Sequence, residues 1–192
     1  TPIEETLVAL DQLVKDNKVG HIGASSMYTW QFAKSLWTSN ELDLQRFETM
    51  TNFYNLCYRE EEREMIPFCK DQNISVLPYS PVAKGFLTGK YTRNEKNDTI
   101  RFKTDPRLAE RFFKPEDFDV LEIVMQISNE KGVKPAQIAL AWLLEKNTAP
   151  IIGVTKTSHV EDAVESLNIK LTSNDMKQLE EPYKMHPTTG YE

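Results

Sequence analysis

The sequence predicts an α/β fold built on a parallel sheet, and two observations predict that class. Runs of strand-forming residues alternate four times with amphipathic helical patterns. Because helix-length segments separate these runs, the connections are expected to be crossovers between parallel strands and not hairpins. With 192 residues and a hydrophobic content of 40%, the chain is long enough for one domain with a sizeable core over residues 1–192.

The first part of the chain is expected to supply a helix, a strand, a second helix and a second strand. TPIE at residues 1–4 combines a capping box with proline at the first helical position, and the leucines that follow recur at helical spacing. Residues 19–24 then predict a short strand, residues 30–39 a helix with an apolar stripe, and residues 47–52 a second strand.

An acidic helix and a third strand are expected next. Residues 59–72 predict a helix whose first turn is rich in glutamate, which complements the helix dipole. Pro67 lies inside this segment and predicts a kink or an early end. Residues 74–79 predict the third strand. The polar stretch at 88–115 that follows is long enough to indicate a functional or mobile connection.

The last part of the chain is predicted to be mostly helical. Residues 118–131 and 136–146 have clear helical periodicity, and proline precedes the second of these segments. Residues 149–153 predict a fourth strand. Ser158 is expected to cap a helix that runs to about residue 167, and Ser173 to cap another that runs to about residue 181.

Composition excludes several classes of protein. The net charge of −6 argues against a general nucleic-acid binder, and no apolar run is long enough to span a bilayer. No signal peptide is visible at the N-terminus, and two cysteines do not make a disulfide framework, so a cytoplasmic location is the expectation. No metal site is expected, because the histidines are far apart in the sequence. They are His21, His159 and His186.

Two architectures are consistent with this order of elements. One is an open doubly wound sheet, and the other is part of a (β/α)8 barrel. Four strand–helix units are too few to close an eight-stranded barrel, whose complete form needs about 250 residues. Both architectures place ligands at the carboxyl ends of the strands, where the unusual residues of this chain also lie.

The predicted strand ends share a chemistry that suits a nucleotide. Hydroxyls in the segment 23–26 can bond an amide, and Tyr79 offers a face for a flat heteroaromatic ring. Glycines after Tyr79 let backbone N–H groups approach phosphate. The segment 151–159 runs through glycine, threonine and lysine into a helix N-terminus, which is an anion site. The sequence therefore indicates a cofactor with a flat base and several phosphates.

Several segments, in this order and spacing, resemble the aldo-keto reductase family, and in particular its fungal and bacterial aryl-alcohol dehydrogenase-like and versiconal hemiacetal acetate reductase-like members. The resemblance covers nearly the whole chain. It rests on TPIEETLVALDQLVKDNKV, HIGASSMYTWQF, YNLCYREEEREMIPFCK, VLPYSPVAKGFLTGKY, KPAQIALAWLL and PIIGVTKTSHVEDAV.

The resemblance implies a partial (β/α)8 TIM barrel, made of roughly strands 5–8 with their helices. Residues 1–192 would then be the C-terminal half of a reductase, with the N-terminal half absent. The implied activity is NADP(H)-dependent reduction of aldehydes or ketones, including aryl compounds, to alcohols. The family's catalytic Asp, Tyr, Lys and His belong to the first half, so no catalytic residue is assigned here and this chain alone is expected to be inactive.

The resemblance also implies cofactor contacts. Ser25 and Ser26 match the positions that bind the nicotinamide carboxamide, and Tyr79 matches the aromatic residue that stacks on the nicotinamide ring. The remaining matches fall in the pyrophosphate loop, the cofactor clamp and the segment around the adenosine and its 2′-phosphate. They are Ser80, Pro81, Val82, Lys90, Arg101, Gly153, Thr155, Lys156, His159 and Asp162.

The sequence departs from the family pattern at three positions of the implied cofactor site. Thr51 stands where the family usually has a glutamine that contacts the carboxamide. His159 replaces an arginine or glutamine, and Ala163 replaces an asparagine at the adenine. Lys156 is the expected source of the positive charge that an arginine at position 159 would supply.

Plainer interpretations stay open for single residues. Tyr79 alone would be a half-buried core aromatic residue, and Ser26 a polar turn residue. The segment around Lys156 alone would be an ordinary helix cap. For the whole chain, the alternative to a reductase is a non-enzymatic truncated paralogue that acts as an interaction or surface-hydrophobicity protein, because a partial barrel exposes strand edges and apolar faces.

Overall fold

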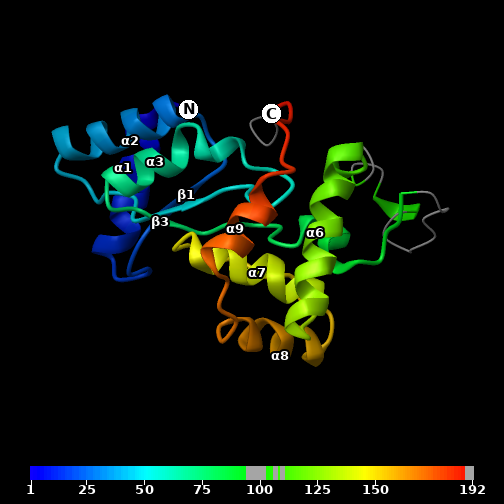
Figure 1. Cartoon of the computed structure of the whole chain (residues 1–192). Helices are drawn as coiled ribbons and strands as arrows, with labels where there is room; N and C mark the ends of the chain where they lie inside the picture. Colours follow the sequence, from blue (N-terminus) through cyan, green and yellow to red (C-terminus); the bar gives the residue numbers. More distant parts are fainter. Residues whose placement is uncertain (94–102, 106–107, 109–110, 189–192) are drawn as a thin grey trace. The chain divides into compact units, whose positions relative to one another are not determined.

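The computed structural model describes residues 1–93, 103–105, 108 and 111–188. The chain divides into two compact units. Unit 1 consists of Thr1–Phe53, Glu60–Leu77 and Pro187–Glu192, and unit 2 of Tyr54–Arg59 and Pro78–His186. Figure 1 colours both units by sequence, so that unit 1 is mainly blue to cyan and unit 2 mainly green to orange.

Unit 1 contains a parallel three-stranded sheet in the order β1-β2-β3. The strands are β1 (Gly23–Ser25), β2 (Thr49–Thr51) and β3 (Ser75–Val76). Ala24 pairs with Met50, which in turn pairs with Val76. The parallel arrangement confirms the predicted α/β class, although each strand is shorter than its apolar run.

Helices flank this sheet and supply its core. They are α1 (Ile3–Lys15), α2 (Thr29–Glu41) and α3 (Met65–Asp71), with a short 3-10 turn, η1, at Glu60–Glu62 (Figure 1). Leu7 and Phe32 have no exposed surface, and Met50 is buried with them in one apolar cluster. Leu7 and Phe32 lie on the buried faces of their helices, as the helical spacing predicts, whereas Met50 comes from β2.

The expected positions of two prolines relative to the helices of unit 1 are wrong. Pro2 is the N-cap residue of α1 and not its first residue, and no side chain caps this helix. Pro67 lies in the first turn of α3, which begins at Met65. A proline there removes an N–H group that has no helical partner, so it is compatible with the helix and does not kink or end it.

Gly23 is expected to be intolerant of a side chain because β2 lies so close to it. A Cβ at Gly23 would lie 2.1 Å from Thr49 Oγ1 and 3.3 Å from the Thr49 carbonyl oxygen. We expect Gly23→Ala to lower the free energy of unfolding by about 1–3 kcal/mol, as overpacking does. Gly20→Ala is the matched control, because nothing lies within 4 Å of a Cβ there. Urea denaturation of both variants checks this, and equal stability would contradict it.

Unit 2 is a helical assembly centred on α7. Its helices are α6 (Pro115–Lys131), α7 (Pro135–Glu145), α8 (Thr157–Ser166) and α9 (Ser173–Glu180), preceded by a 3-10 segment, η2 (Ala83–Thr88). Helix α7 contacts both α6 and α8, and α6 also contacts α9 (Figure 1). Every residue from Ile138 to Leu143 is buried, and Trp142 is fully so. Helix α7 is therefore the core helix of this unit.

The predicted caps of the last two helices are wrong by one or two residues. Lys156 is the N-cap of α8, so Ser158 lies inside the first turn. Thr172 caps α9 in place of Ser173, and its hydroxyl accepts a hydrogen bond of 3.1 Å from the Asp175 N–H. The Thr172–Asp175 pair is a capping box, which competes for the helix start more strongly than a lone serine.

The predicted fourth strand is reduced to a single parallel bridge. Tyr79 pairs with Ile151, and the Ile151 N–H donates to the Pro78 carbonyl oxygen over 2.7 Å. Pro78 and Pro150 have no N–H group to donate, so the ladder does not extend to them as donors. The bridge still brings the segments after Tyr79 and after Ile151 to neighbouring positions.

Candidate functional site

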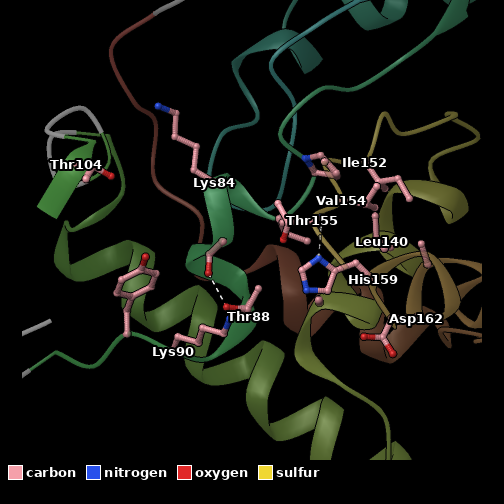
Figure 2. A pocket seen from close by; sticks show the side chains of 17 residues that line it. Lys84, Thr88, Lys90, Thr104, Leu140, Ile152, Val154, Thr155, His159 and Asp162 are labelled. Atoms are coloured by element: carbon pink, nitrogen blue, oxygen red, sulfur yellow. Dashed lines mark hydrogen bonds between the residues drawn. The ribbon is translucent and has the colours of Figure 1, made fainter. Parts of the chain in front are cut away.

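A pocket of about 720 Å³ lies in unit 2, where the segments after Tyr79 and Ile151 meet the helices α7 and α8 (Figure 2). Its volume is within the usual range for cofactor and ligand sites, about 300–1,000 Å³. Its lining residues are Pro81, Val82, Lys84, Gly85, Thr88, Lys90, Tyr91, Thr104, Ala136, Leu140, Ile152, Gly153, Val154, Thr155, His159, Asp162 and Ala163.

One wall is a tight turn with an unusual backbone. Ser80, Ala83 and Lys84 have positive φ angles of 57°, 49° and 56°, which cost strain in residues with a side chain. The Lys84 N–H donates to Ser80 Oγ over 3.2 Å, and Asn55 Nδ2 donates to the Ser80 carbonyl oxygen over 3.2 Å. These bonds hold the turn in its strained form beside the pocket.

The same wall carries cations and a hydroxyl. Figure 2 shows Lys84, Thr88 and Lys90 on this side of the pocket. Lys84 Nζ lies 2.7 Å from the Asp105 carboxylate, and Lys90 is exposed. The Thr88 hydroxyl donates to the Gly85 carbonyl oxygen over 2.6 Å. Lys90 provides favourable electrostatics for phosphate groups at this wall, whereas the charge of Lys84 is matched by Asp105.

The opposite wall is the segment before α8 together with its first turns. The Thr155 N–H donates to His159 Nδ1 over 3.4 Å, drawn as a dashed line in Figure 2. Because Nδ1 accepts in this contact, the neutral imidazole carries its proton on Nε2. Lys156 is the N-cap of this helix, so the free N–H groups of the helix start and a cation lie together. That combination can bind an anion.

Apolar side chains complete the pocket between these polar walls. Ala136 and Leu140 come from α7, Ile152 and Val154 from the segment before α8, and Ala163 from α8. A flat ring can bury its faces against such side chains while its phosphates reach the polar rim.

The pocket brings together many of the predicted cofactor residues and leaves others apart. Those that line it are Pro81, Val82, Lys90, Gly153, Thr155, His159 and Asp162. Tyr79, Ser80 and Lys156 flank the lining segments without lining the pocket itself. Arg101 lies outside the described residues.

Ser25 and Ser26 belong to unit 1, where Ser25 ends the first strand and Ser26 follows it. Ser25 Oγ donates to the Thr51 carbonyl oxygen over 3.3 Å, and the Ser26 N–H donates to the same oxygen over 3.1 Å. Ser26 has a positive φ of 44°, so the chain turns sharply there. The predicted role of both serines in binding a carboxamide stays a prediction.

Sequence reasoning did not assign several pocket residues. Lys84 stands in the same loop as Pro81 and Val82, so its charge and position were a usable signal. Ala136 and Leu140 gave no such signal, because residues on an apolar helix face are normally expected to pack in the core.

Other kinds of site find no support in the described part of the chain. No group of three metal-binding side chains occurs among those residues, and none of the helices described is both long and apolar enough to cross a bilayer. Both cysteines are buried free thiols, and burial raises the pKa of Cys69 to about 12. Burial, with a smaller effect of the Asp117 charge, also raises the pKa of Cys57 well above its usual value. A thiolate nucleophile is thus unfavourable at neutral pH.

Known proteins resemble this chain over nearly its whole length. The profile of the aldo/keto reductase family matches residues 1–184. A Schizosaccharomyces pombe protein named "Putative aryl-alcohol dehydrogenase C750.01" is 40% identical over 187 residues, which cover 97% of this chain and 57% of the relative. Versiconal hemiacetal acetate reductase of Aspergillus parasiticus is 37% identical over 194 residues, covering 97% and 56%.

A solved structure gives the same fold. The thermostable aldo-keto reductase Tm1743, crystallised with the inhibitor epalrestat, matches with a TM-score of 0.72 at 23% identity and covers 95% of this chain and 55% of its own. The chain therefore spans slightly more than half the length of the relatives it matches.

Proposed function

The chain belongs to the aldo/keto reductase family, and on that basis we propose that the pocket of unit 2 binds the adenosine end and the phosphates of NADP(H). The whole protein would use this cofactor to reduce an aldehyde or ketone to an alcohol. Aryl carbonyl compounds are the proposed substrates, because relatives carry the names aryl-alcohol dehydrogenase and versiconal hemiacetal acetate reductase. A cytoplasmic location accompanies the proposal, since both cysteines are free.

The observation that carries this proposal is the composition of the pocket. A lysine-bearing rim and a helix N-terminus supply charge for phosphates, and apolar side chains between them supply a surface for the adenine ring. This donor set fits a dinucleotide better than it fits a metal or a small neutral ligand.

NADP(H) is proposed over NAD(H) because of the charges next to α8. His159 Nε2–H and the Lys156 side chain are available near the helix start, where a 2′-phosphate would add negative charge. A charge-assisted hydrogen bond to phosphate is stronger than a bond to the 2′-hydroxyl of NAD(H).

This chain's proposed part in the reaction is to bind and orient the cofactor, which supplies the hydride. We assign no catalytic residue within the chain, because the proton donor of the family belongs to a segment that these residues do not match. Ser25, Ser26 and Tyr79 are the proposed contacts of the nicotinamide, and Arg101 a proposed clamp.

Titration of the 192-residue chain with NADPH, followed by cofactor fluorescence, tests the proposed function. We expect saturable binding that adenosine 2′,5′-bisphosphate displaces. His159→Ala is expected to weaken NADPH binding about tenfold, equivalent to about 1.4 kcal/mol, and to change NADH binding by less than about twofold. Absence of NADPH binding to the wild-type chain would overturn the proposal, and equal losses for NADPH and NADH would overturn the assignment of His159.

The same protein preparation tests the assignment of the catalytic groups. With NADPH and an aryl aldehyde, the chain alone is expected to show no turnover above a blank, measured as loss of NADPH absorbance. Turnover that persists after a second purification step would show that a proton donor lies within residues 1–192.

A further inference from the structure

The first turn of α7 is hydrogen-bonded to α8, which forms part of the pocket wall. Gln137 is only 3% exposed, and its Nε2 donates to the Asp162 carbonyl oxygen over 3.0 Å and to Glu165 Oε2 over 2.9 Å. Its Oε1 accepts a hydrogen bond of 2.9 Å from the Lys134 N–H. One buried amide therefore joins the start of α7 to two consecutive turns of α8.

The hydrogen-bonding capacity of this amide is fully matched to its surroundings. An amide nitrogen has two hydrogens, and both have an acceptor on α8, while the amide oxygen caps α7. Lys134 Nζ adds an ion pair of 2.5 Å to Asp162 Oδ1, but its side chain is 61% exposed. Exposed ion pairs contribute little, so the buried Gln137 is the principal link.

The link joins two elements that both line the pocket. Ala136, next to Gln137, and Leu140 line it from α7, whereas His159, Asp162 and Ala163 line it from α8. The spacing between these two sets of side chains depends on how α8 is fixed to α7. Gln137 itself does not line the pocket.

We propose that Gln137 is a positioning residue for the ligand site: it fixes α8 against α7 and so sets the width of the adenosine end of the pocket. This inference rests on the proposed function for the identity of the ligand. The positioning of α8 itself is independent of any ligand and can be measured without one.

Gln137→Glu separates the two roles of the side chain. The carboxylate keeps an oxygen to cap α7, but it presents an acceptor, in place of a donor, to the Asp162 carbonyl and the Glu165 carboxylate. Gln31→Glu is the matched control, because Gln31 holds the same capping position in α2 of unit 1, where its Oε1 accepts from the Tyr28 N–H over 3.2 Å. Both variants add one negative charge at the start of a helix.

Hydrogen exchange and NADPH affinity of the purified chain measure the effect of Gln137→Glu. Hydrogen exchange is expected to become at least about tenfold faster in α8 amides of Gln137→Glu, while α9 amides change less. NADPH affinity is expected to fall about tenfold or more. Gln31→Glu should change neither value by more than about twofold.

A second substitution tests whether the hydrogen bond, and not general instability, is responsible. In Gln137→Glu/Glu165→Gln the donor and acceptor are exchanged, so the bond to residue 165 can form again. We expect this double variant to recover part of the lost α8 protection and of the lost NADPH affinity. A merely destabilised fold would gain nothing from the exchange.

The outcomes distinguish this inference from the proposed function. If the wild-type chain binds NADPH and Gln137→Glu binds it equally well, the inference is overturned and the proposed function stands. If the wild-type chain does not bind NADPH, the proposed function fails, and α8 exchange still decides whether Gln137 positions the helix. Unchanged α8 exchange in Gln137→Glu would overturn the inference in either case.

Discussion

Replacing Asp117 by alanine is expected to lower the free energy of unfolding of the chain by about 3–5 kcal/mol, the usual result of removing one partner of a buried ion pair. Asp117 is 1% exposed, and its Oδ1 lies 3.0 Å from Nε2 of His186, whose side chain is 6% exposed. Asp117 Oδ2 also accepts from the Lys114 N–H over 3.1 Å and so caps α6. The substitution removes a helix cap and the carboxylate that faces the buried imidazole of His186.

Urea denaturation of Asp117→Ala beside Asp117→Asn measures this effect. Asparagine keeps an oxygen that can cap α6 and loses only the charge, so it should cost less than alanine. A loss below about 1 kcal/mol for alanine would show that Asp117 contributes little to stability through this contact and the cap.

The same pair predicts a dependence of stability on pH. The contact with Asp117 raises the pKa of His186 above its ordinary value of 6.5, against the opposing effect of burial. His186 Nδ1 also lies 2.8 Å from the Lys184 carbonyl oxygen, which can accept a hydrogen bond from a protonated Nδ1. A raised folded-state pKa means that this stabilisation is complete below pH 6.5 and is lost as the pH rises through the folded-state value.

Denaturation midpoints between pH 6 and pH 9 check this dependence. The wild-type chain is expected to lose more stability over this range than His186→Gln, whose amide does not titrate. Parallel curves for the two proteins would contradict a role for the His186 charge.

Glu180→Ala is the second substitution with a large expected effect, about 3 kcal/mol, because one carboxylate joins three elements of unit 2. Glu180 Oε1 accepts from Trp142 Nε1 over 3.0 Å and lies 2.7 Å from Lys146 Nζ. Glu180 Oε2 lies 3.2 Å from the Arg59 guanidinium, whose side chain is 11% exposed. Alanine would leave the indole N–H of a fully buried tryptophan and a largely buried arginine without this acceptor.

Thermal and urea unfolding of Glu180→Ala test this expectation, with the exposed neighbour Glu181→Ala as the matched control. Glu180→Gln should lie between them, since the amide oxygen can still accept from Trp142. Equal stability of the Glu180→Ala and Glu181→Ala proteins would rule out the proposed role of the cluster.

Acid should weaken this cluster. Burial alone would raise the pKa of Glu180, but hydrogen bonds from Lys146 and Trp142 and the charge of Arg59 lower it below its ordinary value of 4.5. The stabilisation is therefore present above pH 4.5 and is lost as the pH falls through the lowered folded-state value. The stabilisation by His186 is lost as the pH rises, and that by Glu180 is lost as the pH falls. The effects of His186→Gln and Glu180→Ala on stability can therefore be told apart by their pH profiles.

The sequence by itself determined the order of strands and helices, their parallel connection and the family. Helical spacing, prolines and turn residues act over a few neighbouring positions, which is why the apolar stripe of α7 and the loop after Tyr79 were predictable. Motifs in a fixed order identified the family for the same reason, since each is a short local pattern. The cofactor roles of Ser25, Ser26 and Tyr79 stay predictions.

Only the tertiary structure decided how the pocket is built. The bond between Gln137 and Asp162 joins residues that are 25 positions apart, and Glu180 meets Arg59 over a still longer separation. No local sequence pattern predicts such pairs, because the sequence around a polar helix residue does not show whether its side chain faces water or a buried acceptor. Which of these it faces depends on how α7, α8 and α9 pack, and packing depends on the shapes of many side chains at once.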